Sequence, residues 1–123
     1  MKGIGIDIIE IDRIREAVKK YGSSFLEKVF TAREIDYCRR RKVLKYPELA
    51  VRFAAKEAYA KAIGTGIRGF SRKNNGLGWK EIEVVNNSQG KPLLALKGKI
   101  SKTVQLSLSH SRDYAVACVY VEK

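Results

Sequence analysis

One carboxylate and several cations share a short, alanine-rich stretch near the middle of this 123-residue chain. The stretch runs from Arg52 to Lys61 and has the composition of a helix. Residues four apart lie on one face of an α-helix, so Phe53, Glu57 and Lys61 form one column. Arg52 and Lys56 form a second column beside it. An anion among closely spaced cations could hold a metal ion and a phosphate group together.

A second carboxylate, Asp7, lies in the apolar run 4–9 near the start of the chain. Burying an unpaired carboxylate is costly, so Asp7 must meet water, a cation or a hydrogen-bond network. With Glu57 it could supply two oxygen ligands to Mg²⁺, and water and ligand phosphates would complete the shell. Two simpler roles stay open: Asp7 as a cap of the next helix, and Glu57 as an exposed partner of Lys61 or Arg52.

His110 is the only histidine of the chain, and it lies in a run, 106–111, where serine alternates with other residues. Alternation along a strand would put His110 on the face of Leu106 and Leu108, with the three serines on the other face. The run lacks the G-x-S-x-G elbow, and residues on opposite faces cannot act together directly. Nucleophilic serine catalysis is therefore set aside, and a phosphate-contacting or a structural His110 is expected.

The elements that position these side chains follow from periodicity and turn residues. The pattern predicts, in order, a strand at 4–9, a helix from 11 to a stop at Gly22, a short helix through 25–29, a helix from Thr31 into the basic cluster, a long helix at 47–63, an irregular segment at 64–78, and strands at 81–86, 93–97, 104–110 and 114–121. Thr31 and Glu34 match a capping box, and residues 111–113 could close the last two strands as a hairpin. One strand, several helices and then a mainly antiparallel sheet indicate an α+β fold.

The length and the 45% hydrophobic content predict one domain, residues 1–123, that buries a real core. No apolar run approaches the roughly 20 residues that span a bilayer, and the N-terminus does not match a secretory signal. We therefore expect a soluble cytoplasmic protein without a membrane partner. Cys38 and Cys118 have no metal-site spacing, and two reduced thiols suit that compartment.

A formal net charge of +12 favours acidic partners, such as nucleic acid, anionic lipid, phosphorylated ligands or an acidic protein. The densest basic cluster is 39–42 together with Lys45. A solvated helix end explains that cluster equally well, because cations favour the negative pole of a helix. Charge alone does not choose among these partners.

Taken together, several segments of the chain resemble the holo-acyl-carrier-protein synthase family of 4'-phosphopantetheinyl transferases. The matching segments are Gly3-Ile4-Gly5-Ile6-Asp7-Ile8, Phe30-Thr31-Ala32-Arg33-Glu34, Arg52-Phe53-Ala54-Ala55-Lys56-Glu57-Ala58, Gly64-Thr65-Gly66, Gly90-Lys91-Pro92 and Leu106-Ser107-Leu108-Ser109-His110. They span nearly the whole chain, and the helix segment paired with the N-terminal G-I-D is highly specific. The resemblance implies a 4'-phosphopantetheinyl transferase-like fold.

The resemblance also implies a reaction, in which a serine of apo acyl carrier protein attacks the β-phosphate of coenzyme A. The 4'-phosphopantetheine arm is transferred and 3',5'-ADP leaves, a step that serves fatty acid biosynthesis. Asp7 and Glu57 would be the Mg²⁺ ligands, and Lys61 would contact the transferring phosphate. Arg52 and His110 would help to hold coenzyme A. Glu57 itself and a metal-bound water are both reasonable general bases.

The resemblance implies partners that suit the charge of the chain. Acyl carrier proteins are small and acidic, so a cationic surface would steer their approach. The first helix resembles the carrier-docking segment of the family, and Arg13, Arg15 and Lys20 are the expected contacts. Short family members form trimers with active sites at subunit interfaces, so a homotrimer is expected. The segment 68–79 looks longer than in some relatives, which leaves its place near the site open.

Two other functions compete with this one. The first is a small basic nucleic-acid-binding domain, suggested by the charge and the six tyrosines. No RNP-type aromatic motif, KH loop or helix-turn-helix signature stands out, and a carboxylate centre would repel phosphate unless a metal intervened. The second is a carrier-binding module without catalysis. Intact Asp7, Glu57 and Lys61 argue against that loss.

Overall fold

The structure is a computed structural model that describes residues 2–64 and 78–122. Its elements are β1 (Lys2–Glu10), α1 (Ile11–Tyr21), α2 (Ser23–Val29), α3 (Ala32–Cys38), β2 (Arg39–Arg40), β3 (Val43–Leu44), α4 (Tyr46–Ile63), the 3₁₀ turn η1 (Trp79–Glu81), β4 (Ile82–Asn86), β5 (Pro92–Leu96), β6 (Lys99–Ile100), β7 (Val104–His110) and β8 (Tyr114–Glu122). The predicted α+β class is confirmed.

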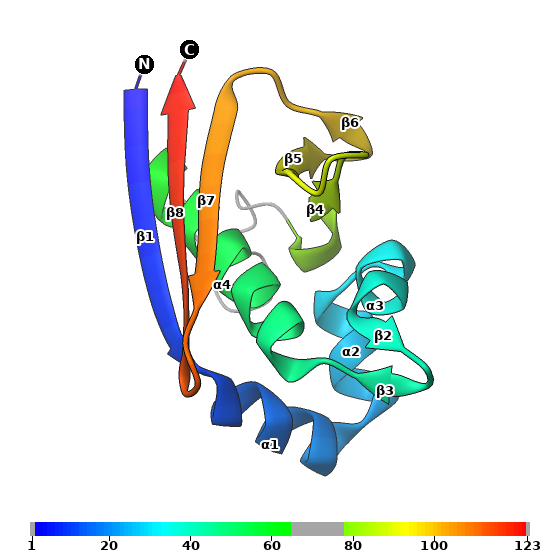
Figure 1. The fold of residues 1–123 in the computed structure, drawn as a ribbon. Helices are drawn as coiled ribbons and strands as arrows, with labels where there is room; N and C mark the ends of the chain where they lie inside the picture. The colour runs from blue at the N-terminus through cyan, green and yellow to red at the C-terminus, as the bar shows by residue number, and fades with distance from the viewer. Residues whose placement is uncertain (1, 65–77, 123) are drawn as a thin grey trace.

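The larger sheet is antiparallel and has the strand order β1-β8-β7. β1 pairs along its whole length with β8, from Lys2 opposite Glu122 to Glu10 opposite Tyr114. The hairpin between β7 and β8 closes where the Ser111 amide donates to the Tyr114 carbonyl at 2.8 Å. The strands of the chain's two ends are therefore neighbours, and β1 and β7 form the two edges of the sheet (Figure 1).

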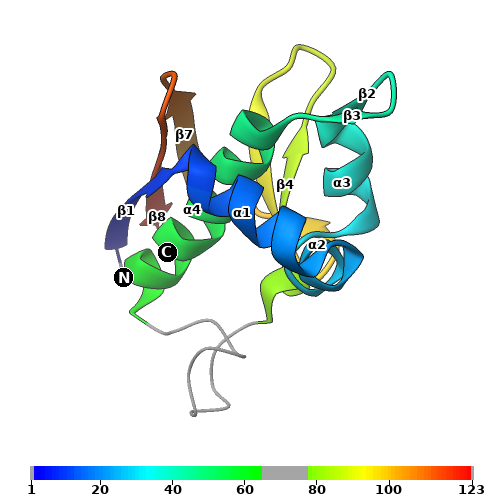
Figure 2. The same cartoon turned by 90° about the horizontal axis from the view of Figure 1, so that it is seen from below.

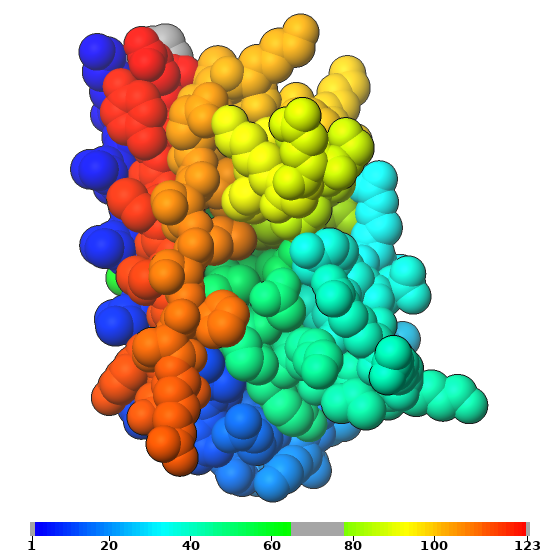
Figure 3. Space-filling model, viewed as in Figure 1, coloured from blue at the N-terminus to red at the C-terminus, as the bar shows by residue number. Residues whose placement is uncertain are grey.

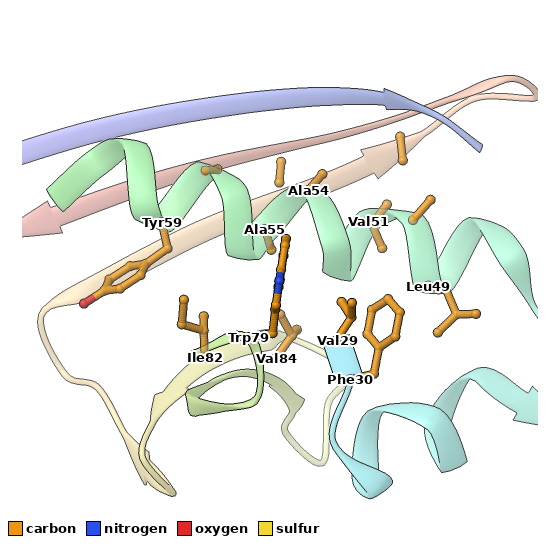
Figure 4. Close-up of a cluster of buried hydrophobic side chains, with 14 of the residues drawn as sticks. Val29, Phe30, Leu49, Val51, Ala54, Ala55, Tyr59, Trp79, Ile82 and Val84 are labelled. Carbon is orange, nitrogen blue, oxygen red and sulfur yellow. The ribbon is translucent and has the colours of Figure 1, made fainter. Parts of the chain in front are cut away.

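The long helix α4 lies across the inner face of this sheet (Figure 1). Pro47 occupies its first turn, and Gly64 ends it in a left-handed conformation with φ 78°. Small residues such as Ala54 and Ala58 are fully buried and allow the sheet to approach closely. On the opposite side of α4, Val29 and Trp79 fill the core (Figure 4).

The second layer consists of α1–α3, the β2–β3 hairpin and a small sheet of order β4-β5-β6 (Figures 1 and 2). The predicted capping box starts α3: the Thr31 hydroxyl accepts from the Glu34 amide, and the Glu34 carboxylate accepts from the Thr31 amide. α4 is thus covered on both sides, by the larger sheet and by this layer.

The main difference from the sequence prediction lies at the basic cluster. The third helix ends at Cys38, and the basic cluster forms the β2–β3 hairpin, with Arg41 and Lys42 at its turn, instead of a helix end. Cys38, the last residue of that helix, is completely buried, and burial raises its pKa to about 12. Both cysteines are free thiols, as predicted. The segment 65–77, most of the predicted irregular stretch, lies outside the described residues.

Candidate active site

Two glycines bring β1 unusually close to α4. A Cβ atom on Gly3 would lie 2.0 Å from the Ala62 carbonyl oxygen, and one on Gly5 would lie 2.0 Å from that of Ala58. No side chain fits into such a gap, so the alternation G-I-G in the sequence follows from strand-on-helix packing. The same face of the strand then presents Asp7 to the C-terminal half of α4.

Asp7 meets Lys61 at this edge of the molecule. The Lys61 ammonium donates to Asp7 Oδ1 at 3.0 Å and to the Ile6 carbonyl at 3.0 Å. Asp7 lies in the middle of β1, whereas the N-cap of α1 is Glu10, which makes no side-chain capping bond. The helix-capping role for Asp7 is therefore wrong.

Glu57 lies on the same flank of α4, partly buried, and forms no ion pair with any described residue. The simple pairing of Glu57 with Lys61 or Arg52 is therefore absent. Burial raises the pKa of Glu57, the negative charge of Asp7 raises it further, and Lys61 lowers it in part. Within residues 2–64 and 78–122, the two carboxylates thus share the positive charge of Lys61.

This donor set fits a hard divalent cation. Mg²⁺ is commonly held by one or two carboxylates, with waters and substrate phosphates as the remaining ligands. Asp7 and Glu57 supply two carboxylates that influence each other's charge, and Lys61 Nζ lies beside them. In residues 2–64 and 78–122 no cluster of three or more carboxylate, histidine or cysteine side chains is present. The pair would therefore need ligand oxygens to complete a magnesium shell.

Lys56 does not belong to this group, which corrects the second column predicted from the sequence. Its ammonium is buried on the far side of α4 and donates to Glu34 Oε1 at 2.6 Å, to the Val29 carbonyl at 2.7 Å and to the Trp79 carbonyl at 3.0 Å. Glu34 Oε2 in turn accepts from the Val84 amide. Lys56 therefore joins α2, α3, η1 and β4 to α4, and it has no access to a ligand.

Arg52, the other member of that column, is also buried. Glu57 is five positions further along the helix, so the two side chains point about 140° apart around it. Its guanidinium donates to Asn86 Oδ1 at 2.6 Å and to Glu48, and it stacks over the Tyr37 ring at 4.3 Å. Arg52 therefore lies on the β7 flank of α4, away from Asp7 and Glu57.

His110 lies on the same flank as Arg52. Two adjoining hollows meet there, and we call them together the His110 hollow. Both are lined by Tyr37, Glu48 and His110, and their other lining residues include Arg40, Lys45, Arg52, Asn86, Pro92 and Ser109. The surfaces of β7, α4 and the β4–β5 turn converge in this region (Figure 3).

Four residues that line this hollow carry no recognisable site motif in the sequence: Tyr37, Arg40, Lys45 and Asn86. Arg40 and Lys45 belonged to a cluster for which a solvated helix end was an equal alternative. The β2–β3 hairpin turns both toward the same hollow as His110, although His110 is 65 or more positions away. One available signal was Gly90-Lys91-Pro92, because Asn86 Nδ2 donates to the Gly90 carbonyl across the β4–β5 turn.

The three predicted carrier contacts lie on α1 in different environments. Arg13 is exposed and 3.7 Å from Glu10, whereas Arg15 forms a 2.7 Å ion pair with Asp12 and stacks over Tyr46 at 5.2 Å. Lys20 lies over the Tyr21 ring at 5.4 Å. The structure therefore leaves Arg13 freer than Arg15 to meet another protein.

The α+β fold thus gathers Asp7, Glu57 and Lys61 on one flank of α4, and a hollow lined by several cations lies on the other flank. The model of the 4'-phosphopantetheinyl transferase superfamily matches residues 3–119, so the chain belongs to this family. The family expectation drawn from the motifs is confirmed.

Relatives agree over nearly the full length. The chain is 48% identical over 123 residues to the holo-[acyl-carrier-protein] synthase of Chloroherpeton thalassium, which covers 97% of this chain and 96% of the relative. The synthase of Chlamydia trachomatis serovar D is also 48% identical, over 126 residues, covering 99% of this chain and all of the relative.

Solved structures of the same class are similar in fold. The holo-(acyl-carrier-protein) synthase of Bacillus anthracis, in complex with CoA (3',5'-ADP), has a TM-score of 0.75 at 40% identity and covers 97% of this chain and 94% of that one. The Helicobacter pylori synthase, in complex with coenzyme A, has a TM-score of 0.79 at 31% identity and covers 97% and 99%.

Proposed function

We infer that this chain is a holo-[acyl-carrier-protein] synthase, which transfers 4'-phosphopantetheine from coenzyme A to a serine of apo acyl carrier protein and releases 3',5'-ADP. The full-length relatives carry the class of reaction. Within the molecule, the main supporting observation is that Asp7, Glu57 and Lys61 converge from β1 and α4. The nucleic-acid alternative receives no support from these relatives.

In this proposal, Asp7 and Glu57 hold Mg²⁺. Bound there, Mg²⁺ would supply positive charge against the negative charge of the pyrophosphate. Lys61 lies beside the same carboxylates and adds a positive charge for the transferring phosphate. For the proton of the serine hydroxyl, Glu57 and a metal-bound water are the two candidate general bases.

We assign coenzyme A binding to the His110 hollow, with Lys61 at the reacting end. Arg40, Lys45 and His110 line the hollow and can meet phosphate groups with positive charge or N–H donors. Arg52 lies at its floor and orders Asn86 and Tyr37 through the contacts described above. Its guanidinium thus supports the hollow while it adds positive charge.

The two halves of this proposed site lie on opposite flanks of α4, which supports a homotrimer with shared sites. β1, next to Asp7, and β7, next to His110, are the opposite edges of one sheet. The outer face of β1 also carries Ile4, Ile6 and Ile8, which are 70%, 60% and 64% exposed. Side chains of β1 project from that edge in Figure 3. A second copy that covers this apolar strand would bury it and bring a β7 edge near Asp7.

The proposal also covers the cellular compartment and the pathway that the enzyme serves. The two free thiols suit a reducing, cytoplasmic compartment, and a role in fatty acid biosynthesis follows from the carrier substrate. Among the described helices, none is both long and apolar enough to cross a bilayer. We treat residues 1–123 as one domain.

One assay separates the three functions considered. The protein is mixed with apo carrier protein, coenzyme A and Mg²⁺, and the carrier is examined by mass spectrometry. We expect the carrier mass to rise by one phosphopantetheine group, and chelation of the metal to abolish the increase. Carrier binding without a mass change would favour a non-catalytic module. Salt-sensitive nucleic-acid binding without a mass change would favour a nucleic-acid-binding domain.

A further inference from the structure

The contact between Lys61 and Asp7 places a cation where a metal ligand is expected. The Lys61 ammonium lies 3.0 Å from both Asp7 Oδ1 and the Ile6 carbonyl oxygen. The Asp7 side chain is 17% exposed and that of Lys61 is 55% exposed. The carboxylate is therefore held at the strand, while the ammonium approaches it from the open side.

An ammonium and a divalent cation cannot both occupy the open side of Asp7 without cost. Mg²⁺ needs carboxylate oxygens at about 2.0–2.1 Å. A lysine ammonium hydrogen-bonded to the same carboxylate would repel the arriving ion, because like charges at short range raise the energy. Glu57 does not offer Lys61 an alternative ion pair in the described structure.

We propose that Lys61 is an internal counter-ion that exchanges partners. In the free protein it neutralises Asp7; when a divalent cation binds Asp7 and Glu57, Lys61 leaves Asp7 and becomes available to the pyrophosphate of coenzyme A. This inference rests on the metal site in the proposed function. It assigns Lys61 a role before any chemistry, as a residue that couples the binding of metal and nucleotide.

The position of Lys61 suits such an exchange. It lies in the last turn of α4, which ends at Ile63, and more than half of its side chain is exposed. Four methylene groups join its ammonium to the backbone, so the charge can move while the helix stays in place. An exposed ion pair contributes little to folding, so loss of the pair should leave the protein folded.

Two consequences follow for binding. Removing the ammonium should tighten metal binding in the absence of coenzyme A, although Lys61 assists the reaction. Coenzyme A should strengthen metal binding in the wild type, because it gives the displaced ammonium a new partner. By reciprocity, metal should strengthen coenzyme A binding by the same factor. Without the ammonium, this coupling should be weaker.

The test is a titration with Mn²⁺, followed by electron paramagnetic resonance, with and without coenzyme A. We expect Lys61→Met to bind Mn²⁺ about two- to fivefold more tightly than the wild type when coenzyme A is absent. Lys61→Arg keeps the charge and should remain near the wild type. Lys2→Met removes the same charge from β1 away from Asp7, so it controls for net charge. Circular dichroism checks that each variant is folded.

Asp7→Asn and Glu57→Gln test the metal site separately from the partner exchange of Lys61. If both bind Mn²⁺ as tightly as the wild type, the metal site itself is wrong and the partner exchange falls with it. If both lose Mn²⁺ while Lys61→Met binds no tighter than Lys2→Met, the metal site stands and the exchange is wrong. An unchanged effect of coenzyme A in Lys61→Met would also overturn the exchange.

Discussion

Burial and the negative charge of Asp7 both raise the pKa of Glu57, and the positive charge of Lys61 lowers it in part. The folded protein therefore binds a proton on Glu57 more readily than the unfolded chain does. That contribution to stability is present at pH below the pKa of unfolded glutamate and is lost as pH rises through the raised pKa of the folded state. At neutral pH, without metal, the Glu57 carboxylate thus costs stability.

Glu57→Gln should separate stability from activity. The amide keeps the shape but cannot carry charge, so we expect the metal-free variant to melt at the same temperature as the wild type or higher at neutral pH. Its kcat should fall about 100-fold or more, because the proposal makes Glu57 a metal ligand. Thermal melts from pH 4 to 8 and a carrier-modification assay measure the two effects. Glu27→Gln, an exposed change on α2, is the matched control. Near-normal kcat in Glu57→Gln would contradict the assignment.

At the scale of elements, the Glu34–Lys56 pair decides how α4 sits on the second layer. Both side chains are completely buried, and each is hydrogen-bonded to backbone of a different element. Burial lowers the pKa of Lys56, and the Glu34 charge opposes this. A buried ion pair need not stabilise the fold more than two apolar side chains of similar size would. Removing one partner, however, leaves the other charge buried without a counter-ion.

Lys56→Met should therefore lower the free energy of unfolding by about 3–5 kcal/mol, because Glu34 remains buried without its cation. Adding Glu34→Gln should recover part of the loss, since the amide needs no counter-ion. Chemical denaturation measures both. Lys61→Met removes an exposed pair and should change stability by less than about 1 kcal/mol, which makes it the control. If Lys56→Met is as mild as Lys61→Met, the pair does not join the elements as described.

The approach of β1 to α4 gives a second prediction at this scale. Gly5→Ala should force the strand away from the Ala58 carbonyl and cost about 1–3 kcal/mol, because the new Cβ overlaps backbone. Gly3→Ala makes an equally close contact but lies farther along the strand from Asp7. We expect similar losses of stability, measured by denaturation, but a larger fall in kcat for Gly5→Ala. Equal falls in kcat would mean that strand position near Asp7 is not critical.

The sequence predicts helix ends well where one residue type favours a helix terminus. A capping box, Thr31 with Glu34, marks the start of α3, and α4 runs from Pro47 in its first turn to Gly64 at its end. Alternation of side chains predicted β7 at its observed bounds. The convergence of Asp7 with the Glu57 flank came instead from family motifs, because 50 positions separate the two residues. Periodicity also could not show that Lys56 is buried, because its partners, Glu34 and two backbone carbonyls, lie on other elements.

For the whole molecule, the positions of the positive charges indicate where an acidic partner could bind. The cations of α1 and of the β2–β3 hairpin lie on segments in the lower part of the molecule as Figure 1 shows it. Arg13 is 75% exposed with only a loose contact to Glu10, so it can meet an acidic carrier at small cost. Such contacts mostly affect encounter and orientation, and they weaken with salt.

Arg13→Glu should raise the apparent KM for the carrier several-fold, with kcat and the affinity for coenzyme A nearly unchanged. The effect should shrink as salt is added, because screening weakens the wild-type advantage. Lys99→Glu, a charge reversal on β6, is the control and should change neither KM. Steady-state kinetics at two salt concentrations measure this. An equal loss for carrier and coenzyme A would show that α1 does not serve the carrier alone.

For the assembly, we predict that two inactive variants regain activity when they are mixed. If Asp7 and Glu57 of one chain act with the His110 hollow of the next, a site is active when one chain has intact carboxylates and its neighbour has an intact hollow. Glu57→Gln and the double variant Lys45→Glu/His110→Ala should each be nearly inactive alone. Unfolded and refolded together in equal amounts, they should recover activity at about one quarter of the sites, since half of the chains suit each side of an interface.

The exposed isoleucines provide the control for this complementation. Ile6→Lys places a charge on the apolar outer face of β1, so it should convert the proposed trimer to monomers in sedimentation velocity and leave circular dichroism unchanged. Introduced into both inactive proteins, it should abolish the recovery. A wild type that sediments as an active monomer, or a mixture that stays inactive although mixed trimers form, would show that each chain carries a complete site. Because β1 and β7 are opposite edges of one sheet, we expect the shared arrangement.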